Sequence, residues 1–247
     1  MRIVFVGTGD AFATDARAHT CFRLESDGRV VVVDFGAAAL VNWRRLGLTF
    51  NDVEAVIVSH LHGDHFGGLP FLLLESQYIA ERVAPLEIIG PPGLRARLSM
   101  AMDAFFPGLT AAPWRFPWRV RELAAGETFA VAGFEGRSAP AHHAAGAPAT
   151  SLRLSANGKT FAYSGDTAWT DHLLDVARDA DLFVCECYAA GPGAPGHMDW
   201  ETLRARLPDL AARRVLLTHM SAPMLARAAE VRAAGLDLAE DGLTLDL

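Results

Sequence analysis

Short runs of apolar, often β-branched residues recur along the chain and predict strands. These runs cover residues 3–6, 30–33, 53–58, 86–89, 152–154, 160–163, 182–185 and 215–217. Several are apolar on both faces, which is typical of strands that lie inside a sheet covered by helices. Between them, apolar residues at helical spacing predict helices over residues 37–46, 70–81, 94–105, 169–178, 200–207 and 223–234.

The order of these elements favours a layered α/β sandwich over a doubly wound sheet, because strands dominate the start and the middle while strands and helices alternate in each half. No glycine fingerprint opens a helix. Gly7-Thr8-Gly9 lacks a lysine at Walker spacing and is interpreted as a tight turn. Glycine and proline at 191–196 predict a loop. No repeat or linker divides the sequence, so one domain is expected over residues 1–247.

Composition narrows the class of protein. The chain has 247 residues, of which 51% are hydrophobic, enough for an ample core. Its net charge of -7 provides no general positive field to gather nucleic acid. Three cysteines are too few for a disulfide framework and suggest a reducing compartment, taken as the cytoplasm. No apolar stretch approaches the roughly 18 residues of a membrane helix, so no membrane partner is expected.

The string HLHGDH at residues 60–65 carries four metal-ligand side chains directly after a predicted strand. Side chains two apart on an extended segment point the same way, so His60 and His62 can share one ion. Gly63 would then let the chain turn, so that Asp64 and His65 face a second ion. Imidazole and carboxylate together suit two Zn²⁺ ions, with Mn²⁺ or Fe²⁺ as alternatives. A solvated polar turn is the competing interpretation, and the density of ligands disfavours it.

This string resembles the HxHxDH signature of the metallo-β-lactamase fold, and HLHGDHFGGLP at 60–70 is similar to its ribonuclease Z branch. The resemblance implies a four-layer αββα metallo-β-lactamase sandwich. It also implies three later ligands: a histidine in the middle of the chain, an aspartate in a Gly-Asp-Thr turn and a histidine after a late strand. The sequence supplies them in that order, as His142 or His143, then Asp166, then His219.

By this resemblance one cation is held by His60, His62 and His143, and the other by Asp64, His65 and His219, with Asp166 as the bridge. Each later residue has a simpler interpretation: Asp166 could cap the following helix, and His219 could be structural. The upstream motif favours the ligand role for both. His142 and His143 would point to opposite faces of a strand. His143 is favoured because its spacing from Pro140 and to Gly146 resembles that of related sequences more closely.

Further residues gain roles from the same resemblance. His197 resembles a proton donor beside the metals, although a surface histidine is the alternative, and its ordinary pKa of about 6.5 suits such work. Asp64 and His197 are therefore the catalytic candidates. Asp34 resembles a buried aspartate that braces the metal loop. Cys185 and Cys187 share one face of a strand and are interpreted as core residues.

The predicted function is a dinuclear metal-dependent hydrolase that uses a metal-bound hydroxide on a small phosphodiester or ester-type substrate. Ribonuclease Z carries a long arm for transfer RNA between the middle histidine and the Gly-Asp-Thr turn. Here only 23 positions separate His143 from Asp166, and the chain is acidic, so transfer RNA is disfavoured as a partner. Trp169, Trp200 and Tyr188, with the 191–196 loop, are the expected walls of a small-molecule pocket.

Several other functions are compatible with the same motifs. The first is a carboxylic ester, lactone or thioester hydrolase, followed by a transfer RNA 3'-processing endonuclease. A diiron oxidoreductase on the same fold is disfavoured because position 62 is a histidine rather than a glutamate. A non-catalytic metal-binding module is the last. β-Lactam hydrolysis is disfavoured because those enzymes commonly lack a histidine at the place of His65. A homodimer is retained because enzymes of this branch often form one.

Overall fold

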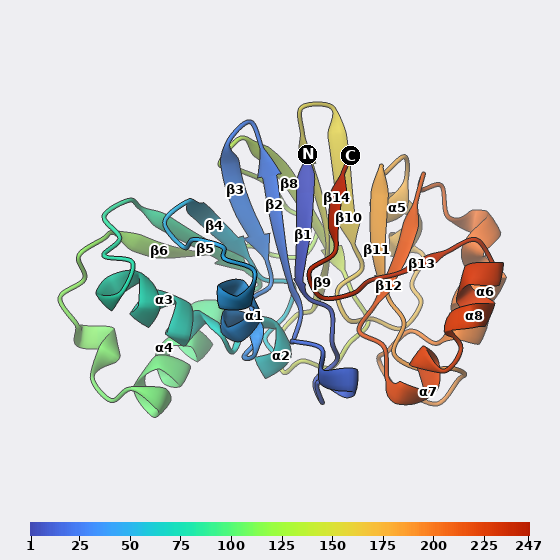
Figure 1. Ribbon diagram of the computed structural model, residues 1–247, viewed down its shortest axis with the longest axis horizontal. Coiled ribbons are helices and arrows are strands. Elements are labelled where there is room, and N and C mark those ends of the chain that lie inside the picture. The colour runs from blue at the N-terminus through green and yellow to red at the C-terminus, as the bar shows by residue number, and fades with distance from the viewer.

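Two seven-stranded sheets lie face to face in the computed structural model, which describes all 247 residues (Figure 1). The first has the order β14-β1-β2-β3-β4-β5-β6 and the second β13-β12-β11-β10-β9-β8-β7. The first sheet consists of β1 (Arg2–Gly7), β2 (Cys21–Ser26), β3 (Arg29–Val33), β4 (Val53–Ile57), β5 (Leu86–Gly90), β6 (Trp118–Glu122) and β14 (Thr244–Asp246). The second consists of β7 (Thr128–Val131), β8 (Phe134–Pro140), β9 (Thr150–Ala156), β10 (Lys159–Tyr163), β11 (Leu182–Glu186), β12 (Val215–Thr218) and β13 (Asp237–Leu238).

Helices cover the outer face of each sheet. The first sheet packs against α1 (Ala39–Arg45), α3 (Leu69–Tyr78) and α4 (Leu94–Phe105), and the second against α5 (His172–Ala177), α6 (Trp200–Arg206) and α8 (Ala228–Ala233). Shorter helices are α2 (Gly63–Phe66) and α7 (Ala222–Leu225), with 3-10 turns at Thr14–Ala16, Leu109–Ala111 and Leu207–Asp209. The longest helix has 12 residues, and none has the length and hydrophobicity needed to cross a bilayer.

Three apolar clusters separate the four layers. The central cluster joins the inner faces of both sheets, where the ring of Phe22 meets Tyr163 edge-on at 5.2 Å between centroids. The outer clusters lie between each sheet and its helices. The strands therefore present apolar residues on both faces, as the sequence indicated. The predicted four-layer αββα sandwich is confirmed.

The eight predicted strands all exist, and six others were not predicted. β6 and β8 carry charged residues on one face, and the pairing of β8 with its neighbours leaves Glu135 and Arg137 exposed. A short strand with a charged outer face lacks the apolar run that reveals a buried strand. The helix predicted over 223–234 is two helices, because the backbone at Arg227 leaves helical geometry between α7 and α8.

The topology brings the carboxyl ends of several strands to one edge. β3, β4, β5 and β6 are parallel to one another in the first sheet, as are β10, β11, β12 and β13 in the second. The segments that follow β3, β4, β8, β10 and β12, one of which includes the short helix α2, contain all the predicted metal ligands and the Asp34 brace. Rigid strands therefore hold the segments on which the candidate site is built.

Candidate metal centre

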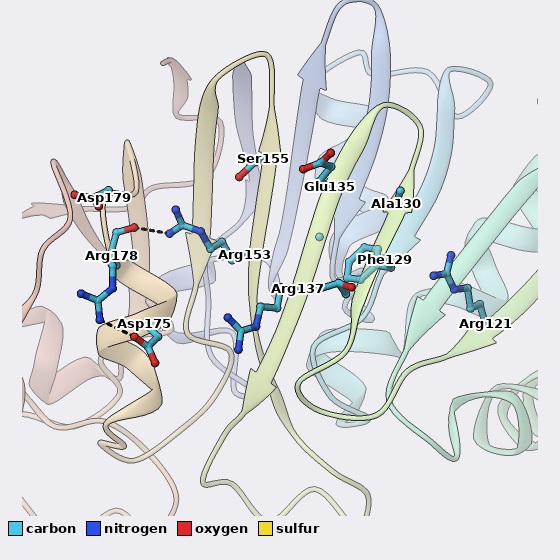
Figure 2. Close-up of a pocket in the computed structure, with 12 residues that line it drawn as sticks. Arg121, Phe129, Ala130, Glu135, Arg137, Arg153, Ser155, Asp175, Arg178 and Asp179 are labelled. Carbon is cyan, nitrogen blue, oxygen red and sulfur yellow. Dashed lines mark hydrogen bonds and ion pairs between the residues drawn. The ribbon is translucent and has the colours of Figure 1, made fainter.

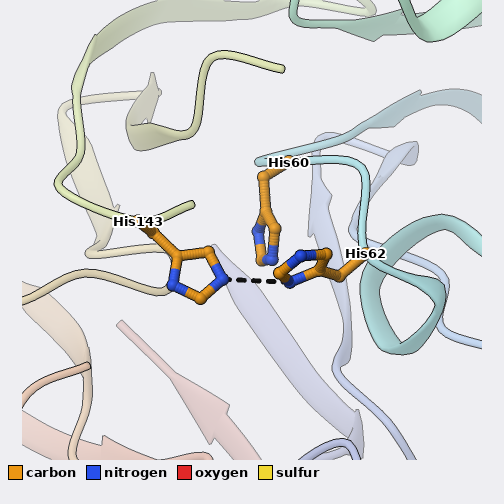
Figure 3. Close-up of side chains that lie close together, drawn as sticks. All are labelled: His60, His62 and His143. Atoms are coloured by element: carbon orange, nitrogen blue, oxygen red, sulfur yellow. Dashed lines mark hydrogen bonds between the residues drawn. The ribbon is translucent and has the colours of Figure 1, made fainter. Parts of the chain in front are cut away.

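Three histidines form the first cluster (Figure 3). His60 and His62 follow β4, and His143 comes from the loop between β8 and β9. His143 Nε2 lies 2.9 Å from His62 Nδ1, and one ring nitrogen from each histidine lies within 4.8 Å of the others. His143 Nδ1 lies 2.8 Å from the Gly196 carbonyl oxygen, to which it can donate, which leaves Nε2 free to bind a cation. The adjacent His142 is exposed, so the structure brings only His143 into the cluster.

A second cluster consists of Asp64, His65, Asp166 and His219, all of them buried. His65 Nε2 lies 3.3 Å from a carboxylate oxygen of both Asp64 and Asp166, and His219 Nε2 lies 3.3 Å from Asp166 Oδ2. The same Asp166 oxygen lies 3.8 Å from His60 Nε2 in the first cluster. Asp166 therefore lies between the two groups of donors, where a bridging carboxylate would be.

These residues fit divalent cations. His60 Nε2, His65 Nε2 and Asp166 Oδ1 are buried and have no hydrogen-bond partner. Buried polar atoms nearly always have a partner, so several orphaned atoms gathered at one site fit the binding of cations. Nitrogen and carboxylate oxygen donors suit zinc, manganese or iron, and two carboxylates would offset part of the positive charge.

The electrostatics of the cluster favour the same conclusion. Burial alone would raise the pKa of Asp166, but the charges of His219 and His65 hold it well below its usual range. Burial lowers the pKa of His60 and of His219. For His65, burial opposes protonation, yet the charges of Asp166 and Asp64 raise its pKa well above the ordinary value. Positive charge is therefore stabilised between the two carboxylates, where a cation would bind.

The backbone is constrained at two of these positions. Gly165, just before Asp166, has φ of 62°, and a Cβ there would lie 2.5 Å from the Thr150 carbonyl oxygen. Only glycine fits this turn. His219 has φ of 59°, a left-handed conformation that is uncommon for a residue with a side chain. Such strain persists where the surrounding structure imposes it, often at functional sites.

Asp34 connects the end of β3 to the metal loop. Its carboxylate accepts hydrogen bonds from the Ser59 backbone N–H and hydroxyl, both at 2.7 Å, and lies 2.7 Å from His65 Nδ1. A proton on Nδ1 leaves His65 Nε2 free to face the cluster. The carboxylate thus fixes both the loop after β4 and the orientation of one histidine.

Replacing Asp34 by asparagine is expected to weaken divalent-cation binding by about 10- to 100-fold, because the amide is a poorer partner for the His65 N–H and the Ser59 donors. Equilibrium dialysis with Zn²⁺ measures the change. Asp181→Asn is the matched control, since Asp181 also accepts a backbone hydrogen bond but from Thr160. Equal affinity in Asp34→Asn and wild type would contradict the bracing role.

A buried glutamate, which the sequence did not reveal as functional, contacts the candidate proton donor. Glu186 Oε1 is in close contact with His197 Nδ1, and Glu186 Oε2 accepts from the backbone N–H groups of Thr167 at 2.8 Å and Met198 at 3.1 Å. Burial, reinforced by the charge of Asp166, raises the pKa of Glu186 to about 7. Burial lowers the pKa of His197, but the hydrogen bond to Glu186 and the charges of Glu186 and Asp166 together raise it above its ordinary value.

His197 lies over the metal centre and is partly open to solvent. Its ring centroid is 4.7 Å from that of His143 and 5.8 Å from that of His219, onto which it stacks. The side chain is 22% exposed, so it can meet both solvent and a bound substrate. With Nδ1 engaged by Glu186, Nε2 is the atom available for proton transfer. Asp166, Glu186, His197 and His219 are also close enough together to hold a cation themselves.

A family model described as anti-Pycsar protein Apyc1 matches residues 1–242. The chain belongs to this family. A relative named ribonuclease Z from Mycobacterium bovis (strain BCG / Pasteur 1173P2) is 30% identical over 196 residues, which cover 74% of this chain and 69% of the relative. This similarity confirms the ribonuclease Z-like branch of the metallo-β-lactamase superfamily that the sequence indicated. The Apyc1-family chain is a metal-dependent hydrolase of that superfamily.

Solved structures show the same fold. The short form of human tRNase Z superposes with a TM-score of 0.79 at 23% identity, covering 100% of this chain and 99% of the other. A diphosphatase from the PhnP family also gives a TM-score of 0.79, at 18% identity, covering 100% of this chain and 97% of the other. These matches confirm the architecture of the Apyc1-family chain.

Two expectations about the surroundings of the site have different outcomes in the Apyc1-family chain. Trp200 was expected to line the pocket, which is wrong: it is fully buried in the core beneath the second sheet. Trp169 packs partly against that core. Tyr188 does lie at the site, with its ring centroid 4.9 Å from that of His197. An aromatic residue beside a loop can belong to the core as readily as to a pocket, and only the packing distinguishes the two.

In the Apyc1-family chain the two adjacent middle histidines make a matched pair for mutation. His143→Ala is expected to lower affinity for one cation by about 100-fold, because it removes one donor of the three-histidine cluster. His142→Ala should leave cation affinity within about two-fold of wild type, because the His142 side chain is exposed and only its backbone is hydrogen-bonded, to Thr167 Oγ1 and to the Ala168 N–H. Isothermal titration with Zn²⁺ checks both. Equal losses in the two variants would contradict the placement.

Proposed function

We propose that this chain is a dinuclear metal-dependent phosphodiesterase that acts on a small phosphodiester, with a cyclic mononucleotide as the first substrate to test. The observation that carries the proposal is the position of Asp166, whose Oδ2 lies within 3.9 Å of imidazole nitrogens from both clusters. One shared carboxylate between two groups of donors suits two neighbouring cations.

In this proposal the two cations have separate ligands and one bridge. Asp166 is the bridge, and the other ligands are His60, His62 and His143 for one ion, and Asp64, His65 and His219 for the second. Zn²⁺ is the proposed metal, with Mn²⁺ or Fe²⁺ as alternatives. When bound, the ions would lower the pKa of a water molecule toward about 7 and polarise a phosphoryl oxygen.

The other residues position groups and move protons. Asp34 holds the Nδ1 side of His65, so that its Nε2 faces the centre. His197 donates a proton from Nε2 to the departing oxygen, while Glu186 holds the proton on Nδ1 and stabilises the charged ring. Tyr188 lies against His197 and limits the movement of its ring.

Phosphorus is the favoured reaction centre. The ribonuclease Z relative and the PhnP-family diphosphatase are both named for the cleavage of phosphate esters or anhydrides. A small substrate is favoured over transfer RNA because the segment between His143 and Asp166 contains only the β9–β10 hairpin. That hairpin closes at Asn157-Gly158, both with positive φ, a tight turn with no room for an arm. The net charge of -7 points the same way.

A panel of substrates tests whether the chain prefers a small phosphodiester to an ester or to transfer RNA. The metal-loaded protein would be assayed with a 3',5'-cyclic mononucleotide, bis-4-nitrophenyl phosphate, a lactone, a thioester and a precursor transfer RNA. We expect kcat/KM for the two small phosphodiesters to exceed that for the lactone and thioester by at least about 100-fold, or about 3 kcal/mol of transition-state stabilisation. A preference for the lactone or thioester would replace the phosphodiesterase by an esterase, and efficient cleavage of the precursor would restore transfer RNA processing.

A homodimer is also proposed, through an apolar groove on α1 and α3. Val41, Tyr78 and Ile79 line this groove and are 53%, 54% and 67% exposed. Apolar side chains gathered on one face are typical of an interaction surface. Ile79→Glu is expected to convert a dimer to the 26.5 kDa monomer, as measured by light scattering after size exclusion. Arg232→Glu on α8 is the control. A wild-type monomer, or a dimer that tolerates Ile79→Glu, would contradict this interface.

A further inference from the structure

A second polar hollow lies on the outer face of the second sheet, and none of the proposed metal ligands lines it (Figure 2). Its volume is about 870 Å³. Four arginines from separate segments surround it: Arg121 on β6, Arg137 on β8, Arg153 on β9 and Arg178 after α5. The small side chains of Thr128, Ala130 and Ser155 leave the space between them open.

Two of these arginines face each other directly. In the antiparallel pairing of β8 with β9, Arg137 is the partner of Arg153, and Figure 2 shows both side chains on the same side of the sheet. Like charges in directly opposite positions destabilise a sheet. The Arg137 guanidinium makes no hydrogen bond or ion pair within the protein, and Arg121 forms a long ion pair of 3.8 Å with Glu87. Glu135, Asp175 and Asp179 also line the hollow, so its charge is mixed, and Arg137 is the guanidinium there that has no hydrogen-bond or ion-pair partner of its own.

The other charged residues of the hollow differ in the hydrogen bonds and ion pairs that they form. Arg153 donates through Nη1 to the carbonyl oxygens of Val176 and Arg178, and its other guanidinium nitrogens are free. Arg178 is paired with Asp175 at 2.7 Å. Glu135, two positions before Arg137 on the same face, forms no ion pair. Charged residues often protect an exposed sheet edge, but that role does not require two arginines opposite each other.

We propose that this hollow is a second nucleotide-binding site, separate from the centre where the substrate is cleaved. The guanidinium groups of Arg137 and Arg153 would bind the phosphates in the bidentate manner that arginine allows. The carboxylate of Glu135 would accept hydrogen bonds from ribose hydroxyl groups. The hollow is open to solvent, and its volume of about 870 Å³ is large enough for a nucleotide. The mixture of several guanidinium groups with a free carboxylate favours a nucleotide over a bare phosphate.

Calorimetric titration of the metal-loaded full chain with ADP at low salt tests the site. We expect Arg137→Ser to weaken ADP binding at one site by about ten-fold or more, because it removes a charge-assisted contact. Adenosine, which lacks phosphate, should not bind there. Arg232→Ser, which removes an exposed arginine on α8, should leave binding unchanged. The kcat/KM of Arg137→Ser for bis-4-nitrophenyl phosphate should equal that of wild type, which separates this site from the metal centre.

Three results would overturn the proposal: no ADP binding outside the metal centre, equal ADP affinity in wild type and Arg137→Ser, or equal binding of adenosine and ADP. Titration with a single-stranded RNA oligomer is a further test. If it binds the wild type and is lost in Arg137→Ser while ADP does not bind the hollow, the surface serves nucleic acid and the nucleotide site is wrong. Because Arg137 is exposed and unpaired, its substitution should not prevent folding.

Discussion

Asp166→Asn is expected to lower kcat/KM for a small phosphodiester by about 1,000-fold or more. A carboxylate shared by two cations contributes several kcal/mol to cation binding and to transition-state stabilisation. The amide keeps the shape of the side chain but loses its charge. Asp166 Oδ2 is the one oxygen that lies near imidazole nitrogens of both clusters, so no neighbour can replace it. The cation content, measured by elemental analysis, should fall from two equivalents to one or fewer.

The control for this variant is Asp181→Asn, which makes the same change at a carboxylate that accepts from Thr160 and contacts Lys159 and Arg213. It should retain activity and two cations. Circular dichroism would verify that both variants are folded. Full activity in Asp166→Asn, with two cations bound, would show that the carboxylate is not a bridge.

His197→Ala is expected to slow cleavage strongly for a substrate with a poor leaving group and only slightly for a substrate with a good one. General-acid catalysis contributes about 10²- to 10⁴-fold when the departing oxygen is a poor leaving group such as a ribose hydroxyl. The loss should be under about ten-fold for bis-4-nitrophenyl phosphate, because 4-nitrophenolate departs without a proton. Steady-state kinetics on a cyclic mononucleotide and on the aryl ester measure both values for one protein preparation.

Metal content decides between two roles for His197, since it also lies among Asp166, Glu186 and His219 in an arrangement that could hold a cation. The proton-donor role predicts that His197→Ala keeps both cations. Loss of a cation, or equal loss of rate on the two substrates, would instead make it a ligand or a structural residue. His172→Ala, an exposed histidine at the start of α5, is the matched control and should change neither value.

Local parts of the site could be predicted from the sequence because they obey local geometry. His60 and His62 lie two positions apart on an extended segment, so their side chains point the same way. The apolar strand β4 before them places both at the edge of the sheet. The later residues did not follow from local rules. Asp166 and His219 each resemble an ordinary cap or structural residue, and only the family resemblance connected them to the motif. The structure then placed both within reach of His65.

Other features depend on strand pairing, which the sequence does not display. Glu186 lies between Cys185 and Cys187, whose alternation indicated a buried face, but the same alternation places the glutamate on the opposite face, toward His197. The alternation along this strand therefore predicts a glutamate that faces away from the two cysteines. Arg137 and Arg153 are 16 positions apart and become neighbours only through the register of β8 and β9. The strand that carries Arg137, β8, was not predicted because its outer face is charged.

We propose that two cations at one centre drive hydrolysis of a small phosphodiester. The most direct measurement strips the protein with a chelator, returns Zn²⁺ in steps and follows hydrolysis of a 3',5'-cyclic mononucleotide at each step. We predict no turnover in the stripped protein and a rise that saturates at two equivalents per chain. Turnover that persists without metal, saturates at one equivalent, or never appears when two cations are bound would contradict the claim.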